Sequence, residues 1–199
     1  MTYNALIYNI ENNIQFSFSR FGDGEMICMW KTNRSCNCDG HKYYPELGRR
    51  LLAVLDDPKG VMGLQRLGYS QFKREIDKYD IKWCDADILH DASIAGEFGK
   101  FENALLDRRV ILVGPYHLKD FICDVFIEVP KVNAWLKYEE VLEDVNRNVE
   151  VDDVVLYSCG MMAEVLIHNM YAEDFTQIDT GSVFDPYFGV KSRNYHYKL

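Results

Sequence analysis

The chain has 199 residues, a net charge of −9 and a pI near 5.0; 48% of its residues are hydrophobic and 27% are charged. This predicts one globular domain of ordinary size, and the acidic balance disfavours broad contact with nucleic acid or an anionic membrane. The first residues show no basic segment before an apolar run, and no apolar stretch approaches about 18 residues. We therefore expect a cytoplasmic protein with no membrane span.

Helices dominate the first half of the chain, with short apolar strands between them. Strand patterns cover residues 16–21, where phenylalanines alternate with polar residues, and residues 60–64. Residues 32–44 predict a surface loop, and residues 83–89 fit either a helix or a strand. Apolar residues at helical spacing predict helices at 4–14, 26–31, 45–56, from Ser70 to Tyr79 and at 94–106.

From Arg108 onward, strand and helix patterns alternate. The strands are apolar runs at 110–114, 126–130, 153–160 including its turn, and 176–179. The helices lie between or after them at 117–124, 135–149 and 161–171. This order predicts an α/β fold with a Rossmann-like, mostly parallel sheet and helices on both faces. We expect a single domain over residues 1–199, with a motif-bearing part at about 1–107 and βα repeats at about 108–189.

In such sheets, ligands bind beyond the carboxyl ends of the strands. This rule selects Gly114-Pro115-Tyr116, Ser158-Cys159-Gly160 and Asp179-Thr180-Gly181 as the rim of one site. Free backbone N–H groups after Gly160 would suit a phosphate or a ribose. The sequence has no G-x-G-x-x-G and no P-loop motif, which disfavours a dinucleotide dehydrogenase and a P-loop enzyme.

A second feature is the acidic corner at residues 20–25, Arg-Phe-Gly-Asp-Gly-Glu. Here Asp23 and Glu25 stand where a strand turns into a helix, after the fixed cation Arg20. Such a pair is sufficient for Mg²⁺ or Mn²⁺ when phosphate oxygens and waters complete the coordination shell. Alternatively, Asp23 caps the helix and the helix dipole favours Glu25 in the first turn. The residues alone leave both interpretations open.

The acidic corner resembles the D-x-E motif of the GT-D type glycosyltransferases, a bacterial family first catalogued as a domain of unknown function. Further blocks follow in the family's order and span nearly the whole chain. They are residues 110–114, residues 127–133, the strand-turn-helix around Gly160, and Ile178-Asp179-Thr180-Gly181 with Asp185. The resemblance implies a Rossmann-like sheet that binds a nucleotide sugar, with Asp23 and Glu25 at a divalent cation on the donor diphosphate.

The chain departs from the family pattern in two places that bear on the acceptor chemistry. Ser182 stands where family members often carry the His of Asp-x-Gly-His. The first turn after Gly160 also lacks the Lys that is common there. With these departures noted, the resemblance implies a hexosyltransferase that depends on Mn²⁺ or Mg²⁺. We expect the transferred hexose to be glucose and the donor to be a UDP sugar. The acceptor is expected to be a hydroxyl group of a glycan or glycoprotein.

The expected site residues fall into two groups. Catalytic candidates are Asp23, Glu25, Asp179 and Asp185, of which Asp23 and Glu25 are also the metal ligands. Nucleotide and phosphate contacts are expected from Arg20, Gly22, Gly114, Tyr116, Ser158 and Gly160. The sequence leaves open the base and sugar of the donor, the acceptor, the stereochemical outcome and whether the chain forms a homo-oligomer.

Two other functions remain open, a silent nucleotide-sugar binding module and a metal-dependent phosphohydrolase. Zinc is disfavoured, because the cluster Cys36-Asn37-Cys38-Asp39-Gly40-His41 lacks a second pair of ligands at finger-like spacing. The pair His90-Asp91 could orient an acceptor hydroxyl, although a surface pair is favoured. His117 could cap a helix or contact a ligand at the sheet edge, and His168 is expected to be structural. The basic and aromatic tail, Arg193 to Lys198, is a candidate to fold over a substrate, although chain ends commonly fray.

Overall fold

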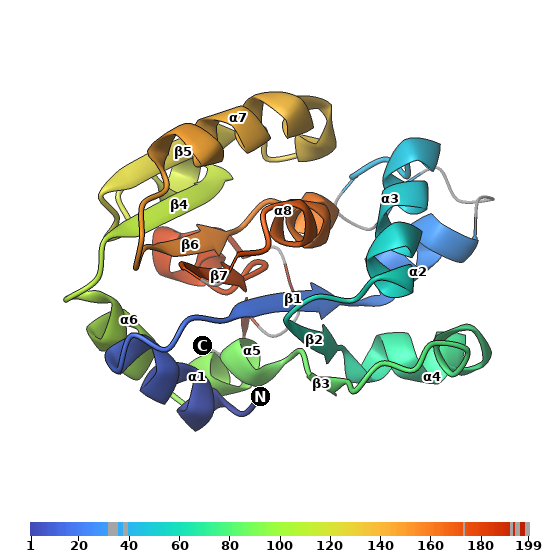
Figure 1. Cartoon of the computed structure of the whole chain (residues 1–199), viewed down its shortest axis with the longest axis horizontal. Coiled ribbons are helices and arrows are strands. Elements are labelled where there is room, and N and C mark those ends of the chain that lie inside the picture. The colour runs from blue at the N-terminus through green and yellow to red at the C-terminus, as the bar shows by residue number, and fades with distance from the viewer. Residues whose placement is uncertain (32–35, 38–39, 173, 192, 194–195, 198–199) are drawn as a thin grey trace.

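Seven parallel strands form one sheet in the order β3-β2-β1-β7-β6-β4-β5 (Figure 1). This computed structural model describes residues 1–31, 36–37, 40–172, 174–191, 193 and 196–197. The strands are β1 (Ser17–Phe21), β2 (Val61–Leu64), β3 (Cys84–Asp85), β4 (Val110–Pro115), β5 (Val125–Val129), β6 (Val154–Tyr157) and β7 (Thr176–Asp179). The structure confirms the expected parallel α/β sheet with helices on both faces.

Helices cover the two faces and form two separate apolar cores. The α-helices are α1 (Tyr3–Glu11), α2 (Asp23–Trp30), α3 (Pro45–Asp56), α4 (Arg66–Ile76), α5 (Ile88–Ile94), α6 (Gly99–Leu105), α7 (Tyr138–Asn148) and α8 (Ala163–Asn169). Short 3-10 helices are η1 (Tyr116–Leu118), η2 (Ala134–Lys137), η3 (Gly160–Met162) and η4 (Asp185–Phe188). Within the described residues, no helix is both long enough and apolar enough to cross a membrane.

The central strands contribute alternate residues to the two cores, because successive side chains of a strand point to opposite faces. Ile111 and Val113 of β4 pack with α2, α3, α7 and α8. Val110 and Leu112 of the same strand pack with α1, α5 and α6, which lie together in Figure 1. Burial on both faces explains the continuous apolar runs in the sequence of these strands.

The helix expected at 117–124 is wrong. The chain forms only η1 there and returns to β5, whose Val125 lies beside Ile111 of β4. The nine residues between Pro115 and Val125 must run back along the full length of β4, which leaves no room for an α-helix. The spacing of Leu118 and Phe121 resembles that of a helix because both side chains fill the second core.

Two further expectations needed correction in the segment 66–106. The helix expected at 94–106 begins only at Gly99, as α6, because α5 ends at Ile94 and Gly96 after it adopts a left-handed φ of 73°. The helix expected from Ser70 begins earlier, at Arg66, and the Ser70 hydroxyl donates to the Leu67 carbonyl inside it. The open segment 83–89 contains both alternatives, since β3 ends at Asp85 and α5 begins at Ile88.

The connections place a crevice between β4 and β6. From β4 the chain leads to β5 at one edge of the sheet, whereas from β6 it leads to β7 in the opposite direction. Neighbouring parallel strands whose connections diverge in this way define a topological switch point, where ligands of open α/β sheets bind. The fold therefore predicts a ligand site at the carboxyl ends of β4 and β6.

Candidate functional site

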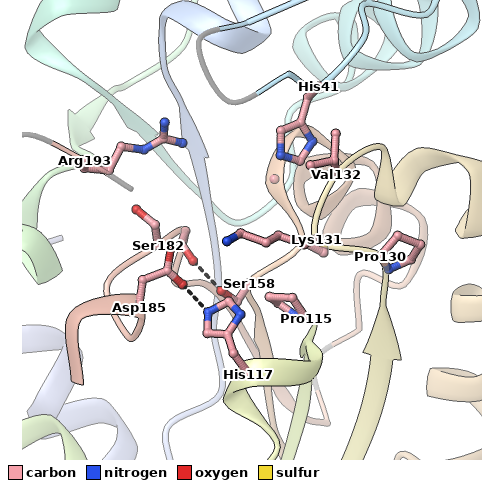
Figure 2. Close-up of a pocket in the computed structure, with 13 residues that line it drawn as sticks. His41, Pro115, His117, Pro130, Lys131, Val132, Ser158, Ser182, Asp185 and Arg193 are labelled. Carbon is pink, nitrogen blue, oxygen red and sulfur yellow. Dashed lines mark hydrogen bonds and ion pairs between the residues drawn. The ribbon is translucent and has the colours of Figure 1, made fainter. Parts of the chain in front are cut away.

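A pocket of about 280 Å³ lies at this switch point (Figure 2). Residues from the carboxyl ends of four neighbouring strands line it: Pro115 at the end of β4, Pro130 after β5, Ser158 after β6 and Gly181 after β7. All three rims selected from the sequence therefore contribute to one pocket. Among the predicted site residues, Ser158, Gly160 and Asp185 line it directly.

The other predicted contacts of the rim lie near the pocket without lining it. Gly114 is buried under Leu118 and Ser158, and a Cβ at this glycine would lie 3.2 Å from a Leu118 methyl group. Tyr116 is 57% exposed, and its ring lies under the Lys119 ammonium. Gly160, which does line the pocket, adopts a left-handed φ of 63° and lies against the His41 ring, so a glycine suits this turn.

Two cations reach the pocket from opposite sides. Figure 2 shows Lys131, which follows β5, and Arg193 of the C-terminal segment directed toward the same space. The sequence analysis did not assign Lys131 to the site, although the rule of strand ends applies to it as well as to Gly114. Arg193 belongs to the tail that was left as a candidate, of which Tyr195 and Lys198 lie outside the described residues.

A histidine and a carboxylate form a close pair at the base of the pocket. Nε2 of His117 lies 2.8 Å from Oδ1 of Asp185, and both side chains are largely buried (Figure 2). His117 comes from η1 after β4, and Asp185 from η4 after β7. Beside them, the Ser158 hydroxyl donates to the Gly181 carbonyl at 2.6 Å. Asp185 was among the predicted catalytic residues, but its pairing with His117 was missed because the two residues are 68 positions apart in the sequence.

The acidic corner lies at the start of α2, outside the lining of the pocket. Gly22 is the N-cap residue, and Oε2 of Glu25 accepts its backbone N–H at 2.7 Å. The carboxylate that caps the helix is thus Glu25, not Asp23. Burial raises the pKa of Glu25 to about 7. Met161, which follows Gly160, packs over Gly24, so this corner adjoins the turn of the pocket.

Arg20 is a buried cation that is held from several directions. Its Nε donates to the Ala86 carbonyl at 2.7 Å, and Nη2 lies 3.3 Å from Nδ1 of His90. Nη1 lies 4.0 Å from Oδ2 of Asp179, the predicted catalytic residue at the end of β7. These contacts place Arg20 and Asp179 in the protein interior, behind the rim of the pocket.

Glu164 of α8 completes this buried group and was not predicted. It is 1% exposed, and its Oε2 has no hydrogen-bond partner among the described residues. Burial raises its pKa well above the usual range, and the charges of Glu25 and Asp179 raise it further. Burial next to Asp179 and Glu25 therefore favours the neutral form of Glu164. A charged residue inside the apolar run of residues 161–167 was the available sequence signal.

The structure also places His90 and His168 and describes part of the cysteine cluster. His90 faces Arg20 and Asp87, while Asp91 pairs with Arg66 instead. His168 contacts the Asp57 carbonyl at 3.0 Å, away from the pocket. In the zinc candidate, Cys38 lies outside the described residues. Across the described part of the chain, no group of three or more His, Cys, Asp or Glu side chains is placed to hold a metal ion.

Comparison with known proteins gives matches in structure alone. No model of a protein family matches this sequence, and no curated protein does so. A structure described as a new glycosyltransferase from Streptococcus sanguinis matches with a TM-score of 0.73 and 17% identity, over 94% of this chain and 82% of that chain. A second structure matches with a TM-score of 0.72 and 17% identity, over 99% of this chain and 87% of that chain. It is described as the domain of unknown function 1792 with a distinct glycosyltransferase fold. The chain therefore has the fold of the domain of unknown function 1792, as the resemblance of its acidic corner implied.

Proposed function

We propose that this chain is a glycosyltransferase, which moves a hexose from a nucleoside-diphosphate sugar to a hydroxyl group of a glycan or glycoprotein acceptor. UDP-glucose is the donor that we propose to test first. The fold supports this proposal, since the similar structures are described as a glycosyltransferase or as having a glycosyltransferase fold. The observation that carries it is the pair of cations at the switch-point pocket.

The electrostatics of the pocket suit a diphosphate. The chain has a net charge of −9, yet Lys131 and Arg193 converge on this one pocket. Departure of a nucleoside diphosphate builds negative charge on the leaving oxygen, and cations held in place stabilise that charge without reorganisation. Lys131 and Arg193 would hold the donor phosphates, while Ser158 and the turn at Gly160 would position the rest of the nucleotide.

A divalent cation at Asp23 and Glu25, Mn²⁺ or Mg²⁺, is a second part of the proposal. The donor set fits such a cation, because it takes carboxylate oxygens and completes its shell with phosphate oxygens and water. One oxygen of Glu25 is engaged by the Gly22 N–H, so the other oxygen and Asp23 would supply the ligands. When bound, the cation would add positive charge beside the donor diphosphate.

Calorimetric titration of UDP and UDP-glucose, with Mn²⁺ and with a chelator, tests the proposal. Lys131→Met should weaken binding by about tenfold or more, roughly 1.4 kcal/mol. Lys100→Met is the matched control, because Lys100 is an exposed surface residue paired with Glu97. In the double variant Asp23→Ala/Glu25→Ala, Mn²⁺ should no longer change the affinity for the nucleotide. Lys131→Met, added to this double variant, should still weaken binding.

The products separate this function from its alternatives. A glycosyltransferase releases UDP from UDP-glucose, whereas a phosphohydrolase releases free phosphate or a nucleoside monophosphate. Donor binding without release of UDP would identify a binding module. Failure of the wild type to bind any nucleotide, with or without the metal, would overturn the proposed function.

A further inference from the structure

We infer that His117, oriented by Asp185, is the base that accepts the proton of the acceptor hydroxyl; this inference rests on the proposed glycosyl transfer. Its evidence is the placement of the pair in the pocket. His117 and Asp185 both line the pocket and are joined by the 2.8 Å contact between Nε2 and Oδ1. Lys131 and Arg193 line the same pocket.

Backbone hydrogen bonds hold Asp185 at the start of η4. Its N–H donates to the Ser182 carbonyl at 3.2 Å, and its carbonyl accepts the Val190 N–H at 2.9 Å. Pro186 follows at the second position of η4 and restricts the backbone there. The backbone that carries the carboxylate is therefore constrained, and the carboxylate contacts the His117 ring from that position.

The contact determines which nitrogen of His117 is available. A carboxylate accepts hydrogen bonds, so Asp185 favours the tautomer with the proton on Nε2. Nδ1 is then the basic nitrogen, and no hydrogen bond involves it among the described residues. The second ring nitrogen of His117 lies on the side of the ring away from Asp185 in Figure 2.

The reaction balances with this single base. The acceptor oxygen attacks C1 of the donor sugar and forms the new C–O bond, while its proton moves to Nδ1 of His117. The bond between C1 and the phosphate oxygen breaks, and its electron pair leaves with the nucleoside diphosphate near Lys131 and Arg193. Asp185 stabilises the imidazolium that forms. Proton transfer to a base in position contributes about 10² to 10⁴ in rate.

The other histidines do not offer this arrangement. Only His41 and His117 of the five line the pocket. Nδ1 of His41 accepts the Asn133 backbone N–H at 3.3 Å, which ties that ring to the loop after β5. His90 faces Arg20 in the interior, and His168 contacts Asp57. His117 lines the pocket and contacts the Asp185 carboxylate.

The test compares binding with turnover in His117→Gln and in the control His168→Gln, which removes a histidine outside the pocket. We measure binding of UDP-glucose by calorimetry and release of UDP with water and with simple glycosides as acceptors. His117→Gln should keep donor affinity and lose about 10² to 10⁴ in turnover, while His168→Gln should match the wild type in both. Wild-type turnover by His117→Gln, or equal losses of affinity and turnover, would overturn the role of His117.

Two further measurements, on the variant Asp185→Asn and with added azide, distinguish a catalytic base at His117 from a structural role of this residue. Azide attacks as an anion and has no proton to lose, so it should restore donor consumption in His117→Gln and Asp185→Asn, with a glycosyl azide as the product. A lack of recovery with azide in both variants would overturn the inference. A wild type that binds no UDP-glucose would instead show that the proposed donor site has failed, and the proposed reaction with it.

Discussion

Arg20 at the end of β1 and Asp179 at the end of β7 face each other inside the protein, with Nη1 4.0 Å from Oδ2 and both side chains almost fully buried. The strands that carry them are neighbours in the sheet although the residues are far apart in sequence. Removal of one partner of a buried ion pair leaves the other charge uncompensated, which costs more than the pair itself contributes.

Arg20→Met should therefore lower the free energy of unfolding by about 3 to 5 kcal/mol, measured by urea denaturation. Arg49→Met is the control, because Arg49 pairs with Glu46 at the surface, where such pairs contribute about 0 to 1 kcal/mol. The double variant Arg20→Met/Asp179→Asn should recover part of the loss. Equal losses for Arg20→Met and Arg49→Met would contradict this account.

Gly181 must be a glycine for two separable reasons. Its φ is 55°, in the left-handed region, and a Cβ there would lie 2.1 Å from Nη1 of Arg20. Gly189→Ala is the matched control, since Gly189 has a φ of 77° with nothing within 4 Å of the added Cβ. Gly189→Ala should cost about 1 kcal/mol of unfolding free energy from strain alone. Gly181→Ala should cost clearly more, and similar losses for the two would show that Arg20 moves aside freely.

His90 should make the protein sensitive to acid. Burial and the charge of Arg20 together lower the pKa of His90 from 6.5 to about 4, although Asp87 acts in the opposite direction. Between pH 6.5 and about 4 the unfolded chain binds a proton that the folded protein does not, so stability falls as the pH falls through this window. The loss attributable to His90 is at most about 3 kcal/mol.

Urea denaturation at several pH values tests this effect. His90→Gln should lose less stability than the wild type between pH 6.5 and 4, because it removes the titrating group. His168→Gln should show the full wild-type loss, since its imidazole lies elsewhere. Parallel pH curves for the wild type and His90→Gln would exclude the predicted contribution.

Glu164 should have the opposite effect on how the stability of the protein depends on pH. Its pKa lies well above 4.5 in the folded protein, so above pH 4.5 the unfolded chain releases a proton that the folded protein keeps. Stability attributable to Glu164 therefore falls as the pH rises above 4.5. Glu164→Gln keeps the shape of the side chain and is neutral at every pH, so it should gain stability over the wild type as the pH rises.

Glu164→Leu provides the comparison for the polar character of this side chain. It removes the acid and also every polar side-chain atom beside the buried Asp179, so the gain should shrink or reverse. Thermal or urea unfolding of the three proteins at pH 5 and pH 8 distinguishes the two effects. A constant difference between the wild type and Glu164→Gln at both pH values would be inconsistent with a neutral Glu164.

The sequence by itself determined the parallel sheet and the edge at which ligands bind. Strands buried on both faces need continuous apolar runs, and the glycines and polar residues after those runs mark their carboxyl ends. The run at 110–114 became β4, and all three predicted rims meet at one pocket. Local chemistry also placed Asp23 and Glu25 in the first turn of α2.

The tertiary structure alone decided which side chains meet. His117 and Asp185 are 68 residues apart, and Arg20 and Asp179 come together only because β1 lies beside β7. Strand order depends on the packing of the whole sheet, which no local pattern specifies. The same packing buries Glu164 and directs Lys131 and Arg193 into the pocket. The role of each of these charged groups therefore depends on the folded structure and could not be assigned from the sequence.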